Sequence, residues 1–388
     1  MKNIQLLNKI AKVGTDVLDK NEYNIGEGVS SPDAIMVRSA AMHDMEFAPN
    51  LRAIARCGAG VNNIPVDRCS ETGIVVFNTP GANANGVKEL AIAAILLAAR
   101  DITGGIDWAK SLKGTEGVAK AVEKGKSAFA GTEIAGKTLG VIGLGAIGGL
   151  VANAASDLGM NVVGCDPYLT VEAAWNMSRK VKKVASFEDV FKAADYVTLH
   201  VPATPQTKNM ICADTLAVMR DGVKIINLSR ADLVNADDMK AAIESGKVSS
   251  YVTDFPTEET VDVPGIITIP HLGASTAESE DNCAVMASHQ LDDFLRNGNI
   301  KNSVNYPNVS LAHVPGCSRV GVFHKNVPAV ITQISGAFAE QGINIENFIN
   351  GSKGDNAYTL IETATPVDSA VAAKIAEIDS VVRVEVIR

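Results

Sequence analysis

The sequence predicts an α/β protein with two doubly wound parallel-sheet domains, one inserted in the other, followed by a small βαββαβ module. A chain of 388 residues is too long for one hydrophobic core. Short apolar runs alternate with longer helical stretches, which is typical of a parallel sheet wrapped by helices. A strand, a glycine turn, a helix and a second strand follow one another within 138–166, and residues 318–388 repeat strand, helix, strand, strand, helix, strand.

Composition limits the possible partners. Hydrophobic residues make up 46% and charged residues 20% of the chain, as in a compact globular protein. The net charge of −9 argues against a nucleic-acid partner, although a local group of basic side chains could still bind a small anionic substrate. Because no apolar run has the length of a signal peptide or a membrane span, we expect a cytoplasmic protein without a membrane partner. No C-x-x-C pair occurs, so the cysteines predict neither a metal site nor a disulfide framework.

The elements follow in order along the chain. Buried strands are expected at 34–39, 53–57 and 74–78, and a nearly all-apolar helix at 86–100. Residues 101–131 have weak periodicity, and a new alternation of strands and helices runs from 137 to 270. The last module should contain strands and helices at 318–324, 329–341, 343–350, 357–363, 369–378 and 381–387.

One of the expected domains is discontinuous in the sequence. Residues 1–98 and 273–301 are expected to form one domain, which the helix at 277–296 completes by crossing back. Residues 99–272 form the inserted domain. A linker at 302–316 leads to the module at 317–388.

The glycine turn predicts a dinucleotide site of the Rossmann type. The strand at 138–142 runs directly into Gly143-Leu144-Gly145-Ala146-Ile147-Gly148, and the helix that follows would present its N-terminus to a pyrophosphate. Asp166 follows the next strand, where an acid accepts the ribose hydroxyls. The alternative is a glycine turn that only packs a helix on a sheet. Because an acid at this point repels a 2′-phosphate and no arginine follows closely, we expect NAD and not NADP.

Three polar residues end apolar runs downstream: Arg230, Asp254 and His271. Ligands of doubly wound sheets bind at the carboxyl ends of strands, so these residues are expected in one crevice. A lone histidine or arginine at a strand end is more often structural, but the joint placement favours catalysis. A histidine can accept a hydroxyl proton, a carboxylate can orient the histidine, and an arginine can bind a substrate carboxylate.

Four segments resemble the D-isomer-specific 2-hydroxyacid dehydrogenases: I-N-L-S-R at 226–230, D-F-P-T-E-E at 254–259, P-H-L-G-A-S-T at 270–276, and H-V-P with T-P-Q-T-K-N-M at 200–210. The resemblance implies a Rossmann cofactor domain inserted in a flavodoxin-like substrate domain, with NAD as cofactor. It assigns catalysis to Arg230, His271 and a glutamate that pairs with His271. The cofactor residues that the motifs imply are Thr79, Gly143, Gly145, Ala146, Ile147, Gly148, Asp166, Val201, Pro202, Thr207, Leu228, Ser229, Asp254 and Gly273.

Two glutamates compete for the role beside His271. The spacing usual in the family selects Glu259, whereas the local F-P-T-E match selects Glu258. We prefer Glu258, because the phenylalanine and proline before it should fix the loop.

Within the family, V-R-S at 37–39 and R-C-G-A-G-V-N-N at 56–63 resemble the substrate loops of members that act on D-3-phosphoglycerate. The resemblance assigns substrate binding to Arg38, Ser39, Gly58, Ala59, Gly60 and Lys126. Backbone N–H groups of the glycine loop would bind a carboxylate, and Arg38 and Lys126 the phosphate. Arg56 and Lys126 could instead be ordinary surface charges. Lys88 departs from the small residue usual at its position.

The C-terminal module resembles an ACT domain. His324, Asn326 and Asn344 match side chains that hold L-serine in related modules, which implies a possible serine effector and a homo-oligomer, either a dimer or a tetramer. Ala329 replaces the usual glycine and could narrow that site. The alternative is a dimerisation module without a ligand.

Together these features predict NAD-dependent oxidation of D-3-phosphoglycerate to 3-phosphohydroxypyruvate, the first step of serine synthesis. One rival is a hydroxypyruvate, glyoxylate or D-lactate type of 2-hydroxyacid dehydrogenase. Another is an NAD-sensing binding protein without catalysis. The ACT-like module, together with Arg38 and Lys126, argues against the first rival. The presence of Arg230, Glu258 and His271 together argues against the second.

Overall fold

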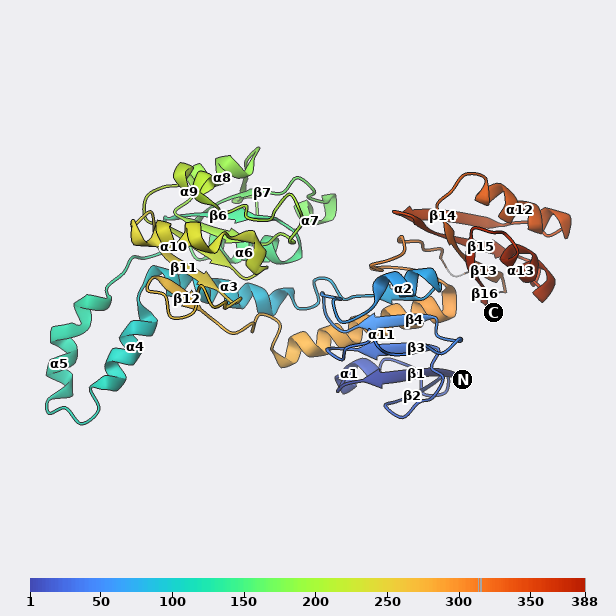
Figure 1. The fold of residues 1–388 in the computed structure, drawn as a ribbon, viewed down its shortest axis with the longest axis horizontal. Coiled ribbons are helices and arrows are strands. Elements are labelled where there is room, and N and C mark those ends of the chain that lie inside the picture. The colour runs from blue at the N-terminus through green and yellow to red at the C-terminus, as the bar shows by residue number, and fades with distance from the viewer. Residues whose placement is uncertain (313, 315, 388) are drawn as a thin grey trace. The chain divides into compact units, whose positions relative to one another are not determined.

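The computed structural model describes residues 1–312, 314 and 316–387, so residues 313 and 315 of the expected linker and residue 388 of the module lie outside the description. The chain forms two compact units, which are described separately. One unit joins Met1–Ala82 to Glu280–Arg388, and the other is the continuous segment Asn83–Ser279 (Figure 1). The expected insertion of one α/β domain into another is therefore present.

The discontinuous unit contains a five-stranded parallel sheet in the order β2-β1-β3-β4-β5. Its strands are β1 (Lys2–Leu7), β2 (Tyr23–Gly26), β3 (Ala34–Val37), β4 (Ala53–Arg56) and β5 (Val75–Phe77). Its helices are α1 (Lys12–Thr15), α2 (Val66–Glu71) and most of α11 (Ala277–Asn297). All four residues of β3 are buried, because helices and loops cover both faces of the sheet at its centre.

The continuous unit contains a seven-stranded parallel sheet in the order β12-β11-β10-β9-β6-β7-β8. Its strands are β6 (Thr138–Ile142), β7 (Asn161–Cys165), β8 (Lys182–Lys183), β9 (Tyr196–Leu199), β10 (Val223–Asn227), β11 (Val248–Thr253) and β12 (Ile266–Thr268). Its covering helices are α3 (Ala84–Ala99), α6 (Ala146–Asp157), α7 (Val171–Trp175), α8 (Phe187–Ala193), α9 (Ala213–Val218) and α10 (Ala236–Glu244), with the short 3-10 helix η2 (Ala231–Leu233). The order reverses direction between β6 and β9, which is the switch point where doubly wound sheets bind ligands.

The units divide the chain at other places than the expected boundaries at 98 and 272. Helix α3 was expected to end the first domain, but it belongs to the continuous unit, where it packs on α6, β10 and β11. Its buried side chains include Ala91, Ala94 and Ala98, which are small enough to let α6 approach closely. The strands expected at 138–142 and 161–165 agree with β6 and β7.

Beyond α3 the chain forms a helical arm, defined as α4 (Ile102–Ser111), α5 (Val118–Gly125) and the 3-10 helix η1 (Lys126–Phe129). Figure 1 shows α4 and α5 extending away from the sheet of their own unit. None of the residues of α4 or α5 is buried in the described chain. Trp108 and Phe129 stack with ring centroids 5.2 Å apart and hold the arm together.

The C-terminal module forms a four-stranded antiparallel sheet in the order β14-β15-β13-β16. Its elements are β13 (Ser318–Lys325), α12 (Val330–Glu340), β14 (Asn347–Lys353), β15 (Asn356–Thr363), α13 (Ser369–Ala376) and β16 (Val381–Ile387). The βαββαβ order agrees with the expectation, although β14 begins later than the expected strand at 343–350.

This module packs directly on the five-stranded domain of its unit. Phe323, Tyr358 and Leu360 belong to one hydrophobic cluster with Phe77 and Phe294, while Val320, Val322 and Ile361 pack with the helices of the module. The two faces of the small sheet are therefore both covered within one chain. The module is an integral part of the discontinuous unit.

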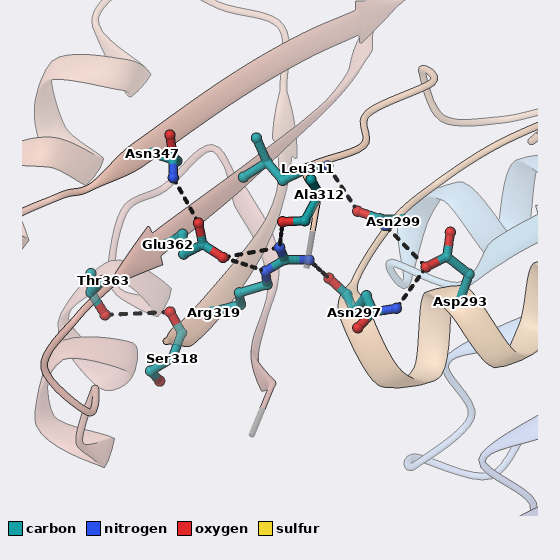
Figure 2. A network of polar contacts seen from close by, with 10 residues as sticks. All are labelled: Asp293, Asn297, Asn299, Leu311, Ala312, Ser318, Arg319, Asn347, Glu362 and Thr363. Carbon is teal, nitrogen blue, oxygen red and sulfur yellow. Dashed lines mark hydrogen bonds and ion pairs between the residues drawn. The ribbon is translucent and has the colours of Figure 1, made fainter. Parts of the chain in front are cut away.

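Buried charges support the same packing (Figure 2). Arg319 donates two hydrogen bonds to Glu362 at 3.0 and 2.9 Å, and it also donates to the backbone carbonyl groups of Asn297 and Ala312. Arg319 and Glu362 are both almost completely buried. A second ion pair joins Arg52 of the five-stranded domain to Glu385 of the module at 2.6 Å.

Within the described residues, no helix is long and apolar enough to cross a membrane, and no group of histidine, cysteine or acidic side chains could hold a metal ion. All six cysteines are unpaired in the structure. They are Cys57, Cys69, Cys165, Cys212, Cys283 and Cys317.

Candidate active site

The glycine turn lies at the carboxyl edge of the seven-stranded sheet, between β6 and α6. Gly143 adopts φ +86°, and a Cβ atom there would lie 2.5 Å from the carbonyl oxygen of His200. A Cβ on Gly148 would lie 1.9 Å from the carbonyl oxygen of Gly143. Both positions therefore require glycine. The Cβ position of Gly145 has no protein atom within 4 Å, so the space beside this residue can hold a ligand at the N-terminus of α6.

Asp166 follows β7 and closes the same turn. Its Oδ2 atom accepts the backbone N–H of Leu144 at 2.9 Å, and its Oδ1 atom accepts that of Tyr168 at 2.8 Å. The carboxylate is thus fixed beside the turn, where it can also accept ribose hydroxyls. Gly143, Gly145, Ala146, Ile147, Gly148 and Asp166 lie together and have the arrangement that a pyrophosphate and a ribose require.

The segment after β9 lies beside β6, at the same edge of the sheet. Thr207 donates from Oγ1 to the carbonyl oxygen of Pro202 at 2.6 Å, and it accepts the N–H of Thr204 at 2.8 Å. Thr207 therefore shapes the loop that carries Val201 and Pro202. His200 donates or accepts a hydrogen bond with Thr198, and burial lowers the pKa of His200 to about 4, so its ring is neutral at pH 7.

Arg230 follows β10 in a turn that the buried Asn227 holds. The Asn227 side chain donates to the carbonyl oxygen of Arg230 at 2.8 Å and accepts the N–H of Ser229 at 3.2 Å. Ser229 donates from Oγ to the carbonyl oxygen of Leu199 at 2.7 Å, which ties the end of β10 to the end of β9. The Arg230 side chain is exposed and available to a substrate carboxylate. The sequence interpretation missed Asn227, although its place at the last position of a buried strand is visible in the sequence.

His271 and Asp254 form the central pair of the site. The His271 Nδ1 atom lies 3.6 Å from Asp254 Oδ2. Asp254 is 1% exposed, whereas the His271 side chain is 58% exposed. Phe255 packs edge-on against the imidazole with ring centroids 4.7 Å apart. Because a buried carboxylate and an aromatic ring hold one side of the imidazole, its Nε2 atom is left for a substrate hydroxyl.

Burial raises the pKa of Asp254, while the charges of His271 and Arg230 act in the opposite direction. These three residues, expected from the sequence to share a crevice, therefore interact electrostatically in the structure. The Asp254 Oδ1 atom is buried and has no hydrogen-bond partner among the described residues.

The expected pair between His271 and Glu258 is not formed in this structure. Glu258 and Glu259 are both exposed, and a hydrogen bond from Thr257 lowers the pKa of Glu259. The carboxylate beside His271 is Asp254, which was expected in the same crevice and which the family resemblance assigned to the cofactor. Asp254 lies close to His271 because it directly follows the buried strand β11. Glu258 lies farther along the exposed loop that comes after it. Leu228 and Gly273 are buried at the same edge.

The substrate residues expected in the other unit also gather at a carboxyl edge. Arg38 and Ser39 follow β3, and the Ser39 N–H is bonded to the side chain of Asn8. The loop of Gly58, Ala59 and Gly60 follows β4. It is held by a bond from the N–H of the buried Thr79 to the carbonyl oxygen of Gly58 at 3.0 Å.

Lys126 lies on the helical arm and not at a sheet edge. Its ammonium group is paired with Glu123 at 2.6 Å, and both side chains are exposed. Lys88, the departure noted above, donates to Asn85 at 2.6 Å on the same turn of α3.

The three expected effector residues do not form one group within a chain. The His324 ring is buried, and its nitrogens lie 2.8 Å from the carbonyl oxygen of Lys325 and 2.9 Å from Thr359 Oγ1. Asn326 follows the end of β13, whereas Asn344 precedes the start of β14. Because β13 and β14 both pair antiparallel with β15, they run in the same direction, and the two asparagines lie at opposite ends of the sheet. Ala329 adopts φ +68°, the left-handed conformation that favours the usual glycine.

Known proteins are similar to most of this chain. The family described as D-isomer specific 2-hydroxyacid dehydrogenase, NAD binding domain, matches residues 92–273 and confirms the expected NAD-binding domain. D-3-phosphoglycerate dehydrogenase of Methanocaldococcus jannaschii is 36% identical over 79% of this chain and 58% of its own length. The protein of the same name from Haemophilus influenzae is 30% identical over 88% of this chain and 83% of its own length. The chain thus spans less than two thirds of the first of these relatives.

Solved structures agree with this similarity. The NAD+-bound 3-phosphoglycerate dehydrogenase of Entamoeba histolytica has a TM-score of 0.61 and 25% identity, and the match covers 78% of this chain and 98% of that one. A glyoxylate reductase from Paecilomyes thermophila, at 24% identity and a TM-score of 0.64, shares the fold over 78% of this chain and 98% of its own.

Proposed function

We propose that this chain, which belongs to the family of D-isomer-specific 2-hydroxyacid dehydrogenases, oxidises D-3-phosphoglycerate to 3-phosphohydroxypyruvate with NAD. The observation that carries the proposal is the pairing of His271 with the buried Asp254 at the sheet edge that holds the glycine turn. A base, an oriented carboxylate and a dinucleotide turn are the parts that alcohol oxidation by hydride transfer requires.

His271 serves as the base. Its Nε2 atom accepts the proton of the substrate hydroxyl, because Asp254 holds the Nδ1 side of the ring and stabilises the imidazolium that forms. Arg230 binds the substrate carboxylate and orients the reacting carbon. When bound, NAD would supply the acceptor for the hydride that leaves this carbon as the substrate alcohol becomes a carbonyl. In the reverse direction His271 returns the proton.

The cofactor is held by this chain's own backbone and by one acid. The N–H groups at the start of α6 bind the pyrophosphate, and Asp166 binds the ribose hydroxyls. Because the carboxylate of Asp166 lies close to the turn, a 2′-phosphate would meet a like charge, which supports NAD over NADP. Thr79, Val201, Pro202, Thr207, Leu228, Ser229 and Gly273 complete the proposed cofactor contacts.

The phosphate of the substrate is assigned to the basic residues of the discontinuous unit. Arg38 lies at the carboxyl edge of the five-stranded sheet, and the loop at 58–60 follows β4 at the same edge. Lys126, on the arm, is proposed as a further phosphate ligand.

A homo-oligomer is also proposed, and the helical arm supports it. Ile102, Ile106 and Val118 are large apolar side chains that are exposed on this arm. Exposed apolar surface on an extended element is typical of an interface with a second copy. Light scattering after size-exclusion chromatography should give a dimer or tetramer for the wild type and a smaller species for Ile106→Glu.

One assay tests the activity. NADH oxidation is measured with 3-phosphohydroxypyruvate, hydroxypyruvate, 2-oxoglutarate and pyruvate under the same conditions. The phosphorylated substrate should have the highest kcat/KM. If one of the other three compounds gave a higher kcat/KM, that compound would replace the proposed substrate. If none of the four were turned over, the chain would be a binding protein.

A further inference from the structure

Arg38 carries a partner that the sequence did not indicate. Its Nη2 atom lies 2.6 Å from Glu280 Oε1, and the two side chains are 42% and 41% exposed. Arg38 follows β3, and Glu280 lies near the start of α11. The guanidinium proposed to receive the substrate phosphate is therefore already paired with a carboxylate.

A second guanidinium lies close by without such a partner. Arg56 Nη1 donates to the carbonyl oxygen of Cys57 at 3.3 Å, and the side chain lies so close to Gly58 that a Cβ there would be 1.2 Å from Nη1. The Nε atom of Arg56 is buried and has no hydrogen-bond partner, and no carboxylate lies within 4 Å of Arg56 in the part of the chain that the structure describes. Burial lowers the pKa of Arg56, and the charge of Arg38 lowers it further.

The cluster of Arg38, Arg56 and Glu280 thus has two positive charges and one negative charge. A phosphate dianion can bind a guanidinium through two parallel hydrogen bonds. In the structure, the contact between Glu280 and Arg38 joins one oxygen to one nitrogen. A dianion also interacts with both arginines at once. A monoanionic ligand offers less charge and competes poorly with the carboxylate that is already present.

We propose that Glu280 is a specificity-determining residue, which holds Arg38 in the absence of phosphate and so weakens the binding of the phosphorylated substrate relative to unphosphorylated hydroxypyruvate. This inference rests on the proposed function, since it concerns the phosphate of the same substrate. Specificity depends on the difference between two affinities, and a carboxylate that only the phosphate has to displace lowers the affinity of the phosphorylated substrate alone. The binding of phosphorylated substrate is correspondingly weakened by the need to break the pair.

The test compares Glu280→Gln with Asp281→Asn, which removes the same charge from the next residue of α11. KM is measured for 3-phosphohydroxypyruvate and hydroxypyruvate, together with the inhibition constant of chloride, a monoanion. An exposed ion pair of this type corresponds to about a two- to five-fold change in affinity. Glu280→Gln should lower KM for the phosphorylated substrate by that factor relative to hydroxypyruvate and should make chloride a stronger inhibitor. Asp281→Asn should change neither ratio.

A double variant separates a direct effect from one that acts through Arg38. In the background of Arg38→Ala, Glu280→Gln should have no further effect on the ratio of the two KM values. The inference would be overturned if Glu280→Gln changed KM equally for both substrates, or if it changed the ratio of the two KM values equally in the absence of Arg38. The proposed function would stand in either case. If Arg38→Ala itself weakened both substrates equally, the assignment of the phosphate would fail first, and the role of Glu280 with it.

Discussion

His271 Nδ1 lies 3.6 Å from Asp254 Oδ2, and the second oxygen of this carboxylate is buried without a hydrogen-bond partner among the described residues. The pair is thus an electrostatic contact between an accessible imidazole and an almost inaccessible acid. Such an acid loses its hydration on folding and regains only part of the free energy from its neighbours. The pair should therefore favour catalysis at a cost in stability.

Asp254→Asn should stabilise the protein most at neutral pH. Because burial raises the folded-state pKa of Asp254 above its unfolded value, the folded state binds the proton more readily, and stability is lost as pH rises from the unfolded through the folded pKa. Because asparagine does not ionise, the variant does not lose this stability as pH rises. Thermal unfolding between pH 3 and 8 should give a Tm advantage for the variant that grows with pH. An advantage that is largest at pH 3 would contradict this reasoning.

His271→Ala should lower kcat by about two to four orders of magnitude and leave NADH binding intact, since a positioned base contributes that much. Steady-state kinetics and NADH fluorescence measure the two quantities. His289→Ala is a suitable control, because His289 is an exposed histidine on α11 outside the site. More than a tenth of wild-type kcat in His271→Ala would remove this residue from the mechanism.

Asp166→Ala should weaken NAD binding and reduce the preference for NAD over NADP, because the like charge that opposes a 2′-phosphate is lost. The measurement is kcat/KM for both cofactors. Asp166→Asn provides a control that keeps a side-chain acceptor for the N–H of Leu144 or Tyr168. An unchanged ratio in both variants would make Asp166 a turn residue only.

Arg319→Leu should destabilise the discontinuous unit by about 3–5 kcal/mol, because the Glu362 charge would stay buried without its main partner. Urea unfolding followed by circular dichroism measures the loss. The double variant Arg319→Leu/Glu362→Leu should regain part of it. Lys110→Leu breaks an exposed pair with Asp107 and should cost less than about 1 kcal/mol. Similar losses for Arg319→Leu and Lys110→Leu would mean that the buried network does not hold the module.

If L-serine binds between two copies, with Asn326 of one and Asn344 of the other, it should inhibit with a coupling of about 1–3 kcal/mol. Asn326→Ala and Asn344→Ala should each abolish inhibition. An oligomer that contains one variant chain of each kind should recover one intact site, because each copy supplies the asparagine that the other lacks. This site would be ruled out if the hybrid oligomers were as insensitive to serine as the single variants. It would also be ruled out if several millimolar serine did not inhibit the wild type.

The sequence contained enough information for the fold class and for most residues of the cofactor turn, because glycine spacing and buried strands are local signals. β1 and β2 were not predicted, since Ile4 is the only buried residue of β1 and polar side chains interrupt both segments. The proximity of Asp254 to His271 could be expected because both residues follow strands at one sheet edge, whereas the family motif pointed to Glu258 or Glu259, which are exposed in the structure. The contact of Arg52 with Glu385 joins distant parts of the sequence, and no local pattern predicts it.

The division of one unit between the two ends of the chain has a consequence for synthesis on the ribosome. The five-stranded domain formed by Met1–Ala82 shares its hydrophobic cluster with α11 and with the last strands of the chain. At roughly 5–20 residues per second, its completion waits on the order of ten to sixty seconds after its own strands emerge. The segment Asn83–Ser279 is contiguous and can fold meanwhile. The first domain in the sequence is therefore the last to fold, and its apolar strands are the part of the nascent chain that most needs a chaperone.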